Sequence, residues 1–393
     1  LMFSLIVAVL NNNRLAWALS TFASSLTMIF SILLCFEVSN NSNISYYLGN
    51  WPPPLGIEYV IDIISIIPIM IVSVIGLIAT LFAHNFFTLE IDEKLVSKTY
   101  SLWLLTIAGL IGLITTADAF NLFVFLEISS LSAVALVALG SKMDRKALIA
   151  GYNYLILGAV GATFYVIGVG LLYGVTGTLN MSDLAQKIPA LGLNKSVIVA
   201  FTFMMLGIMV KAAVFPLHIW LPRAYAYAPS AVSVLLAATA TKASLYILAR
   251  ILFSVFENSE NLINNTLLYV ILPLSIIAMF AGTIMAIYEK DIKRLLAHSS
   301  VAQIGYITLA FAIGTKASVA AGFIHMFNHA IIKGGLFIAI TSLGFYIQKR
   351  VTLNNLSGLG RAMPITFFCF VLCSCLLYTS PSPRDRQKSR MPS

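Results

Sequence analysis

Residues 197–220 read VIVAFTFMMLGIMVKAAVFPLHIW, and this stretch decides the class of fold. Lys211 follows fourteen residues without a charge, and Pro216 lies five positions after it. A lysine at the centre of a membrane helix costs about 2.5–3.5 kcal/mol on insertion scales, so it is expected to face a bundle interior or a wet cavity. Because proline removes a backbone donor and clashes with the preceding turn, we expect the helix to break just after Lys211. A lysine beside such a break favours an ion path over a purely structural role.

Apolar stretches of similar length recur along the whole chain. Hydrophobic residues make up 59% of the sequence and charged residues only 10%, and the mean hydropathy is +0.93. A spanning helix needs roughly 20 mainly apolar residues. Candidate spans lie near 14–38, 57–84, 99–117, 119–140, 147–174, 196–216, 230–256, 265–288, 295–314 and 317–347. The sequence therefore predicts an all-α, polytopic transmembrane helical bundle.

The two ends of the sequence depart from this pattern. The apolar stretch before Asn11 is half a span long, so we expect the chain to start inside a helix. At the other end, the apolar segment ITFFCFVLCSCLLY gives way to TSPSPRDRQKSRMPS, which is basic and rich in proline and serine. We expect residues 374–393 to be a non-native tail and exclude them from fold reasoning.

The positive charges are distributed unequally between the loops. Strict alternation of the spans places on one face Arg14, Lys94, Lys98, Lys142, Arg145, Lys146, Arg223, Lys290, Lys293, Arg294, Lys349, Arg350 and Arg361. The other face receives Lys187, Lys195 and Lys316. The positive-inside rule predicts that the first face is cytoplasmic. The net charge of +9, or +6 without the basic tail, is therefore a topology signal, and no nucleic-acid partner is expected.

The sequence predicts neither a cofactor nor a metal site. The cysteines lie in apolar segments without a CxxC pair, which disfavours disulfide, zinc and iron–sulfur sites. No Walker loop, GxGxxG fingerprint, HExxH or nucleophile elbow is present, so a nucleotide-driven pump or a hydrolase has no support. Histidines and carboxylates occur, but lysine recurs at each candidate position and would compete with a metal ion.

Two further ionisable residues lie at the expected depth of the membrane. Glu127, in ADAFNLFVFLEISSLSAVALVALG, is either a hydrogen-bonded structural acid or half of a coupled pair with a lysine. Intramembrane acids are rare and usually functional, which favours the coupled pair. Lys242, in SAVSVLLAATATKASLYILAR, is surrounded by small residues that let helices approach closely. Because it lies about a dozen residues from either end of its span, it could not easily snorkel to the interface.

A polar stripe follows in AAGFIHMFNHAIIKGGLF, where His325, His329 and Lys333 are spaced four residues apart. This spacing places all three on one face of a helix. Histidine titrates near neutrality, so the stripe is suited to handing protons along. The alternative is a hydrogen-bonded histidine pair that locks helices together. His298 could be a surface residue, and His218 could stabilise the broken segment.

At these residues the chain resembles the proton-conducting antiporter-like subunits of Mrp-type Na⁺/H⁺ antiporters, respiratory complex I and membrane-bound hydrogenases. In that family a glutamate pairs with a lysine on the next broken helix, and a second lysine follows on the adjacent helix. Glu127, Lys211 and Lys242 match those three positions, and DIKRLLAHSSVAQIGY and HMFNHAIIKGGLF resemble motifs of the family's second half. His325 and Lys333 match its proton-path histidine and lysine.

Within the family, GNWPPPLGIEYVID and LPRAYAYAPSAV are most similar to the D-type subunits of Mrp antiporters. Two positions depart from the family pattern, because His298 stands where the family commonly has tyrosine and Tyr225 where many members have histidine. The resemblance implies two five-helix repeats of inverted topology, each with one broken helix. N-terminal helices would occupy residues 1–98, the first repeat 99–256, and an incomplete second repeat 257–373. Its broken helix would begin near Pro364.

The sequence thus predicts the proton-translocating membrane subunit of a multisubunit monovalent cation/proton antiporter. Glu127 and Lys211 would form a gating pair, and Lys242, His325 and Lys333 would relay protons. The expected partners are the other membrane subunits of the complex, the bilayer, protons and monovalent cations, in the plasma membrane of a prokaryote. The alternative is the pump module of an NADH:quinone oxidoreductase-like complex or hydrogenase, which would make the chain a translocase-type subunit. A non-transporting scaffold would leave the buried charges unexplained.

Overall fold

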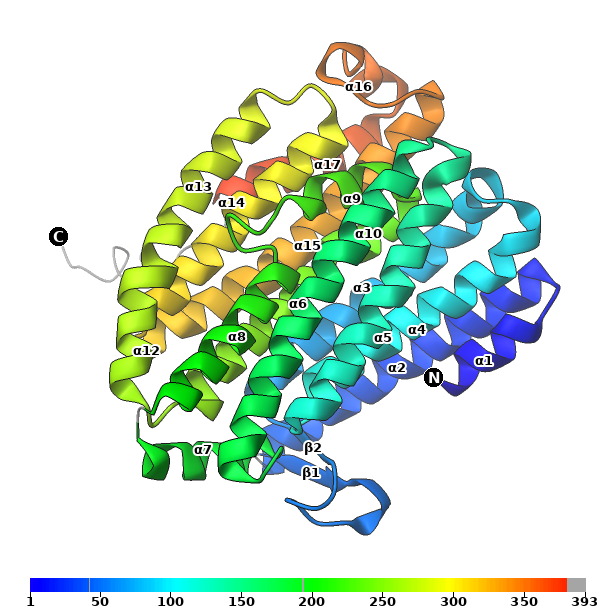
Figure 1. Cartoon of the computed structure of the whole chain (residues 1–393). Helices are drawn as coiled ribbons and strands as arrows, with labels where there is room; N and C mark the ends of the chain where they lie inside the picture. The colour runs from blue at the N-terminus through cyan, green and yellow to red at the C-terminus, as the bar shows by residue number, and fades with distance from the viewer. Residues whose placement is uncertain (42, 193, 380–393) are drawn as a thin grey trace.

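Apolar helices joined by short loops make up most of the chain, because a backbone in lipid must satisfy its hydrogen bonds within the segment. The computed structural model describes residues 1–41, 43–192 and 194–379 (Figure 1). Its first half contains α1 (Met2–Val9), α2 (Asn13–Asn41), β1 (Ile44–Tyr47), β2 (Glu58–Ile61), α3 (Ile63–Glu90), α4 (Val96–Thr115), α5 (Ala119–Ala138), α6 (Lys146–Thr176), α7 (Met181–Leu191) and α8 (Lys195–Lys211). Its second half contains α9 (Trp220–Tyr227), α10 (Ser230–Ala238), α11 (Ala240–Arg250), α12 (Glu260–Thr266), α13 (Leu272–Ile287), α14 (Ile292–Ile313), α15 (Lys316–Ile347), α16 (Leu359–Ala362) and α17 (Pro364–Thr379).

The prediction of a multi-pass helical membrane protein is confirmed. Within the described residues, nine helices are long and apolar enough to cross a membrane, and each coincides with a predicted span. The remaining predicted span, 196–216, corresponds to α8 and the start of the non-helical turn that leads to α9. The expected break after Lys211 is therefore present in the structure.

The predicted span 57–84 was placed too early in the sequence, because α3 begins at Ile63. Residues Glu58–Ile61 instead pair with Ile44–Tyr47 in an antiparallel hairpin, with Ile44 opposite Ile61. Asp62 then starts the helix through a capping box, in which its side chain accepts a hydrogen bond from the Ser65 backbone N–H. The hairpin protrudes from one end of the bundle as the small exception to its all-α character (Figure 1).

The span predicted at 230–256 is interrupted in a way that the sequence did not reveal. α10 ends at Ala238 and α11 starts at Ala240, with Thr239 between them at φ −119°. A short π-helical turn, Ile251–Val255, follows α11. This segment is the most buried of the candidate spans, because 94% of its most apolar 18 residues are buried inside the structure. Its side chains therefore meet other helices rather than lipid.

Small residues allow the helices beside this segment to pack closely. A Cβ atom added at Gly207 of α8 would lie 2.5 Å from the Gly161 carbonyl oxygen of α6. Contacts this short do not occur between real Cβ atoms and backbone, so only glycine fits here. The close approach fixes α8, and with it Lys211 at its end, against the neighbouring helix α6.

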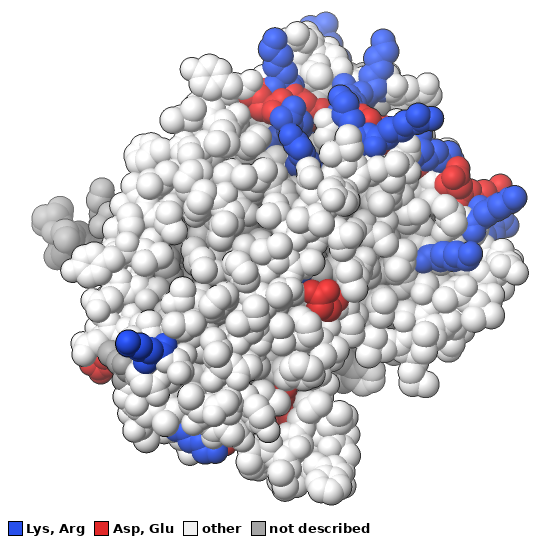
Figure 2. All heavy atoms as spheres, in the orientation of Figure 1, with Lys and Arg blue, Asp and Glu red and all other residues white. Residues whose placement is uncertain are grey.

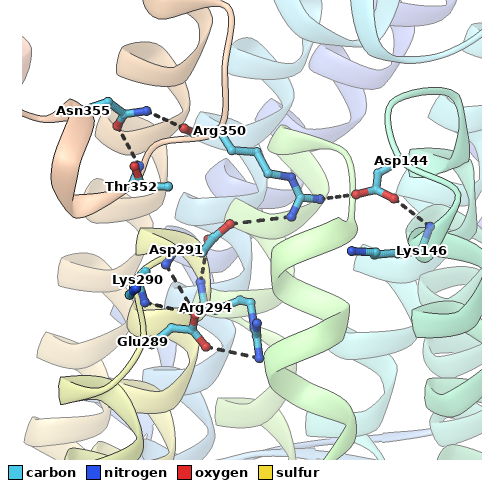
Figure 3. A network of polar contacts seen from close by, with 9 residues as sticks. All are labelled: Asp144, Lys146, Glu289, Lys290, Asp291, Arg294, Arg350, Thr352 and Asn355. Atoms are coloured by element: carbon cyan, nitrogen blue, oxygen red, sulfur yellow. Dashed lines mark hydrogen bonds and ion pairs between the residues drawn. The ribbon is translucent and has the colours of Figure 1, made fainter.

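Most lysine and arginine side chains on the face shown in Figure 2 gather at the end of the bundle that carries α16, as the loop alternation predicted. At this end Arg350 forms ion pairs with Asp144 at 2.6 Å and with Asp291 at 3.6 Å (Figure 3). Its guanidinium also lies over the Tyr227 ring, 4.6 Å from the centroid. We call Asp144, Asp291 and Arg350 the rim network. It joins three loops that are far apart in the sequence.

The C-terminal helix α17 begins at Pro364, where the resemblance places the start of a second broken helix. Residues 374–379 of the predicted non-native tail continue this helix, and residues 380–393 lie outside the described residues. The division into two inverted five-helix repeats stays a prediction.

Candidate functional site

Lys211 is the last residue of α8 and is buried, with 7% of its surface exposed. Beyond it the chain turns through Ala213, at φ +54°, toward Pro216. The indole N–H of Trp220 donates to the Val210 carbonyl at 3.0 Å, so a carbonyl in the last turn of the helix has a partner. Trp220 in turn stacks on Tyr154 with ring centroids 4.3 Å apart. The break is therefore a packed element and holds the lysine in a defined position.

The Lys211 ammonium donates a hydrogen bond to the Ser130 hydroxyl of α5. Ser130 lies one helical turn after Glu127, so the two side chains share a face of α5. Glu127 is partly exposed and close enough to interact electrostatically with Lys211, but within the described ranges it forms no direct ion pair with it. The structure thus brings the predicted pair to one site, with a serine as the direct contact of the lysine.

A small cavity of about 20 Å³ lies beside Lys211, between α5 and the α10–α11 segment. The hydroxyl-bearing residues in its wall are Thr106, Ser129, Ser130, Tyr154 and Ser244. A volume of this size is close to that needed for one water molecule, and a bound water needs two or more polar partners. The sequence analysis did not single out these hydroxyls, although the run EISSLS, which begins at Glu127, is a visible signal.

Lys242 is fully buried in α11, three residues after the irregular Thr239. Its ammonium donates to the Ala237 carbonyl at 2.5 Å. The acceptor is therefore a backbone oxygen near the break between α10 and α11. The break contains neither proline nor glycine, which explains why the sequence did not predict it.

The predicted stripe on α15 is present and faces other helices. Lys333 is fully buried and donates to the Leu296 carbonyl and to the Ser299 hydroxyl of α14, both at 2.6 Å. His325 bonds through Nε2 to Gln303 Oε1 at 2.7 Å. His329 is 1% exposed, and neither ring nitrogen has a hydrogen-bond partner in the described part of the chain.

These side chains form one cluster with Lys242. The rings of His325 and His329 are nearly parallel, with centroids 6.3 Å apart. Lys242 is close enough to interact electrostatically with His325, His329 and Lys333. The structure therefore joins two groups that the sequence separates by more than eighty residues.

His218 and His298 are neighbours beside the broken segment. His218 is buried, His298 is half-buried, and the two interact electrostatically. His298 is therefore partly covered by the segment that carries His218, and a stabilising role of His218 stays a prediction. Among the residues whose placement is described, no group of three or more histidine, cysteine or carboxylate side chains is arranged to hold a metal ion.

Lys211, Lys242 and Lys333, which we call the central lysines, share one kind of environment. Each donates to neutral oxygen acceptors, which are two serine hydroxyls and two backbone carbonyls. A neutral amine retains N–H donors, so the same hydrogen bonds can form with or without the extra proton. A buried ammonium without a carboxylate partner is also costly. The arrangement therefore suits groups that gain and lose protons.

Comparison of the sequence with known proteins identifies its relatives. The profile of the family described as NADH:quinone oxidoreductase/Mrp antiporter, TM, matches residues 116–383. The chain is 41% identical over 336 residues to the N-type subunit of the NADH-quinone oxidoreductase of Desulforudis audaxviator, covering 86% of this chain and 66% of the relative. It is 28% identical over 378 residues to the D-type subunit of the Na(+)/H(+) antiporter of Alkalihalophilus pseudofirmus, covering 96% and 75%.

Solved structures of membrane complexes contain chains with the same fold. A chain of the membrane-bound sulfane sulfur reductase, an archaeal respiratory membrane complex, superposes with a TM-score of 0.86 at 33% identity, covering 95% of this chain and 75% of that one. A chain of the Mrp complex from Dietzia sp. DQ12-45-1b superposes with a TM-score of 0.86 at 28% identity, covering 96% and 68%. The relatives are subunits of multisubunit membrane assemblies.

Proposed function

Since this chain belongs to the NADH:quinone oxidoreductase/Mrp antiporter family of membrane proteins, we propose that it is the proton-translocating subunit of a multisubunit monovalent cation/proton antiporter. Its similarity to the D-type subunit of a Na(+)/H(+) antiporter and to a chain of an Mrp complex supports this function. The observation that carries it is the set of three buried central lysines, each bonded to neutral oxygens. The partners would be the other membrane subunits, in the plasma membrane of a prokaryote.

A second candidate is the pump module of an NADH:quinone oxidoreductase-like complex. The 41% identity to the N-type subunit of an NADH-quinone oxidoreductase favours it, although the chain spans only 66% of that relative's length. In both functions the same side chains would carry protons. An antiporter would be driven by the gradient of the exchanged cation or of protons, whereas the pump module would be driven by redox chemistry in other subunits. The two candidates therefore differ in the partners of the chain and in the source of energy.

The proposed path connects the clusters described above. A proton would be exchanged between Glu127 and Lys211, pass the hydroxyl-lined cavity to Lys242, and continue to His329 and Lys333. Neighbouring ammonium groups repel one another strongly in a low-dielectric interior. A proton that arrives at one lysine therefore promotes release from the next. His325, bonded to Gln303, would lead from this cluster toward the outer end of α15.

The gating step would depend on the distance between Glu127 and Lys211. A shorter distance stabilises the ammonium, and a longer distance favours release of its proton. Ser130 holds the lysine in the present structure. We propose that Lys211 exchanges this hydroxyl for the Glu127 carboxylate during the transport cycle.

The first test replaces Lys211 with Ala in the assembled complex and measures Na⁺-induced proton movement in everted membrane vesicles. We expect coupled transport to fall at least about tenfold, because the path loses its first lysine. Lys195→Ala is the matched control, since Lys195 starts the same helix and is exposed. Full activity of Lys211→Ala in correctly inserted protein would contradict the proposed path. Identification of the co-purified subunits separates the antiporter from the redox-driven pump.

A further inference from the structure

The helix α10 begins without a cap from its own segment. Pro229 precedes the helix, and a proline side chain has no atom that accepts a hydrogen bond from the first backbone N–H groups. All nine residues of α10 are buried, so its contact with bulk water is small. A buried helix start needs a partner from another part of the protein.

Glu90, the last residue of α3, supplies this partner. One oxygen of its carboxylate accepts a hydrogen bond from the Ser230 backbone N–H at 2.6 Å, and the other accepts from the Ser230 hydroxyl at 2.5 Å. The two bonds fix the direction of the contact as well as its length. A negative charge at a helix N-terminus is also favoured by the helix dipole. The contact joins two helices whose bonded residues are 140 positions apart in the sequence.

Lys293, in the first turn of α14, reaches the same residue from a third helix. Its ammonium lies 3.4 Å from the Ser230 hydroxyl oxygen and interacts electrostatically with Glu90. The Ser230 hydroxyl therefore donates to the carboxylate and can accept from the lysine at the same time. The start of α10 is thus held between the end of α3 and the start of α14.

The other end of α10 carries the hydrogen-bond acceptor of a central lysine. The Lys242 ammonium, on α11, donates to the Ala237 carbonyl of α10. The interruption at Thr239 separates the two helices, so α10 can shift without carrying α11 with it. Ala237 follows Ser230 by seven residues, or about 10 Å along the axis. A shift at the start of this short helix therefore reaches the acceptor of Lys242.

We propose that Glu90 is a positioning residue of the proton path, which sets the axial position of α10 and so places the Ala237 carbonyl against Lys242. The proposal rests on the proposed function, because it concerns transfer through the central lysines. Glu90 acts through the backbone of α10 and does not itself carry the proton. Without it, α10 would shift relative to α11, and Lys242 would lose the acceptor that holds its side chain.

The test measures two quantities in the assembled complex, which are Na⁺-induced proton movement in everted vesicles and hydrogen–deuterium exchange of the α10 backbone. We expect Glu90→Ala to speed exchange at the start of α10. It should also lower transport at least about fivefold, because misplacing a reacting group by 1 Å can slow a reaction about a hundredfold. Glu93→Ala is the matched control, since Glu93 is exposed three residues later and should change neither quantity.

Glu90→Gln separates positioning from proton transfer. The glutamine keeps an oxygen that accepts from the Ser230 N–H but has no titratable carboxylate, so it should retain at least about half of the transport. A loss as large as that of Glu90→Ala would overturn the positioning role. If Glu90→Ala does not assemble, Ser230→Ala removes one of the two bonds and should lower transport at least about twofold.

The double variant Glu90→Ala/Pro229→Ser separates positioning from helix capping. Serine is a preferred N-cap residue, so it should restore slow exchange in α10 without restoring the connection to α3. We expect transport to stay low in this variant. Recovery of transport together with slow exchange would overturn the proposal, as would unchanged transport in Glu90→Ala. Exchange does not require transport, so a wild-type complex without Na⁺-induced proton movement would contradict the proposed function alone.

Discussion

The rim network and the central lysines are both clusters of charged side chains, but they are stabilised in opposite ways. At the rim, Arg350 contacts two carboxylates and an aromatic ring (Figure 3). In the centre, Lys211, Lys242 and Lys333 contact hydroxyl and carbonyl oxygens, with no ion pair to a carboxylate in the described chain. The half-exposed charges are paired, whereas the buried ones are not.

This difference separates a structural role from a functional one. A carboxylate partner fixes a cation in its charged form and joins the elements that carry the two charges. A neutral oxygen accepts a hydrogen bond from an amine as well as from an ammonium, so it leaves the protonation state free to change. Retaining unpaired lysines in the interior destabilises the fold, and a structural role alone does not require them.

Among the substitutions considered, Lys333→Met should have the largest effect on proton transport. We expect proton transport to fall at least about tenfold, while the melting temperature stays the same or rises, because replacing a buried charge by an apolar side chain of similar size is often neutral or stabilising. Transport in vesicles and thermal unfolding in lipid nanodiscs check the two parts. A loss of transport that only follows a loss of folded protein would assign Lys333 a structural role.

Ser130→Ala should have a smaller effect on transport than the loss of a central lysine. The substitution removes the hydroxyl that accepts from Lys211, and a hydrogen bond to a charged group contributes about 1.5–3 kcal/mol. We expect transport to fall by roughly tenfold or less, because the Glu127 carboxylate stays available to the lysine. Ser129→Ala is the control, since its hydroxyl lines the same cavity but donates to the Leu126 carbonyl of its own helix. Equal losses in the two variants would contradict the specific role of Ser130.

Arg350→Ala tests whether the ion pairs of the rim network stabilise the fold. It removes two ion pairs and a cation–π contact at a half-exposed site, so we expect stability to fall by about 1–2 kcal/mol. Transport should fall less than in Lys333→Met. The neighbouring Lys349→Ala should lower stability less, because among the described residues Lys349 makes none of the ion pairs. Chemical unfolding of the two variants measures the difference in their stability. Unchanged stability of Arg350→Ala would contradict the structural role of the rim network.

The smallest effect is expected for Asp183 in α7, which lies outside the spans and pairs with Lys187 at 2.9 Å. The hydrogen bond from Lys187 lowers the pKa of the Asp183 carboxyl below its ordinary value of 3.8. A lowered folded-state pKa stabilises above the unfolded pKa, and this contribution is lost as the pH falls through the folded value. Asp183→Asn should therefore cost at most about 0.5 kcal/mol at pH 7, and less below about pH 4.

Thermal unfolding as a function of pH measures this effect. Lys187→Met should reproduce the result, because it removes the same pair from the other side. A cost in either variant that does not change with pH would show that the exposed pair contributes nothing through its charge.

Much of the fold was predictable because its determinants are local. The length of the apolar segments predicted the spans, and Pro216 predicted the break after Lys211. Both signals depend only on residues that are close together in the sequence. The start of α3 was predicted too early because the hydrophobicity of Glu58–Ile61 is compatible with the first turn of a membrane helix. These residues instead pair with the earlier strand Ile44–Tyr47. The break at Thr239 was missed because no residue with a backbone restriction marks it.

The sequence by itself determined that the chain crosses the membrane repeatedly, and which charged residues lie at membrane depth, because hydrophobicity and helical spacing are properties of neighbouring residues. Only the tertiary structure decided what those charges contact. Ser130 is 81 residues from Lys211, Leu296 is 37 residues from Lys333, and Asp144 is 206 residues from Arg350. Such contacts depend on which helices pack side by side, and the periodicity of a single helix carries no information about its neighbours.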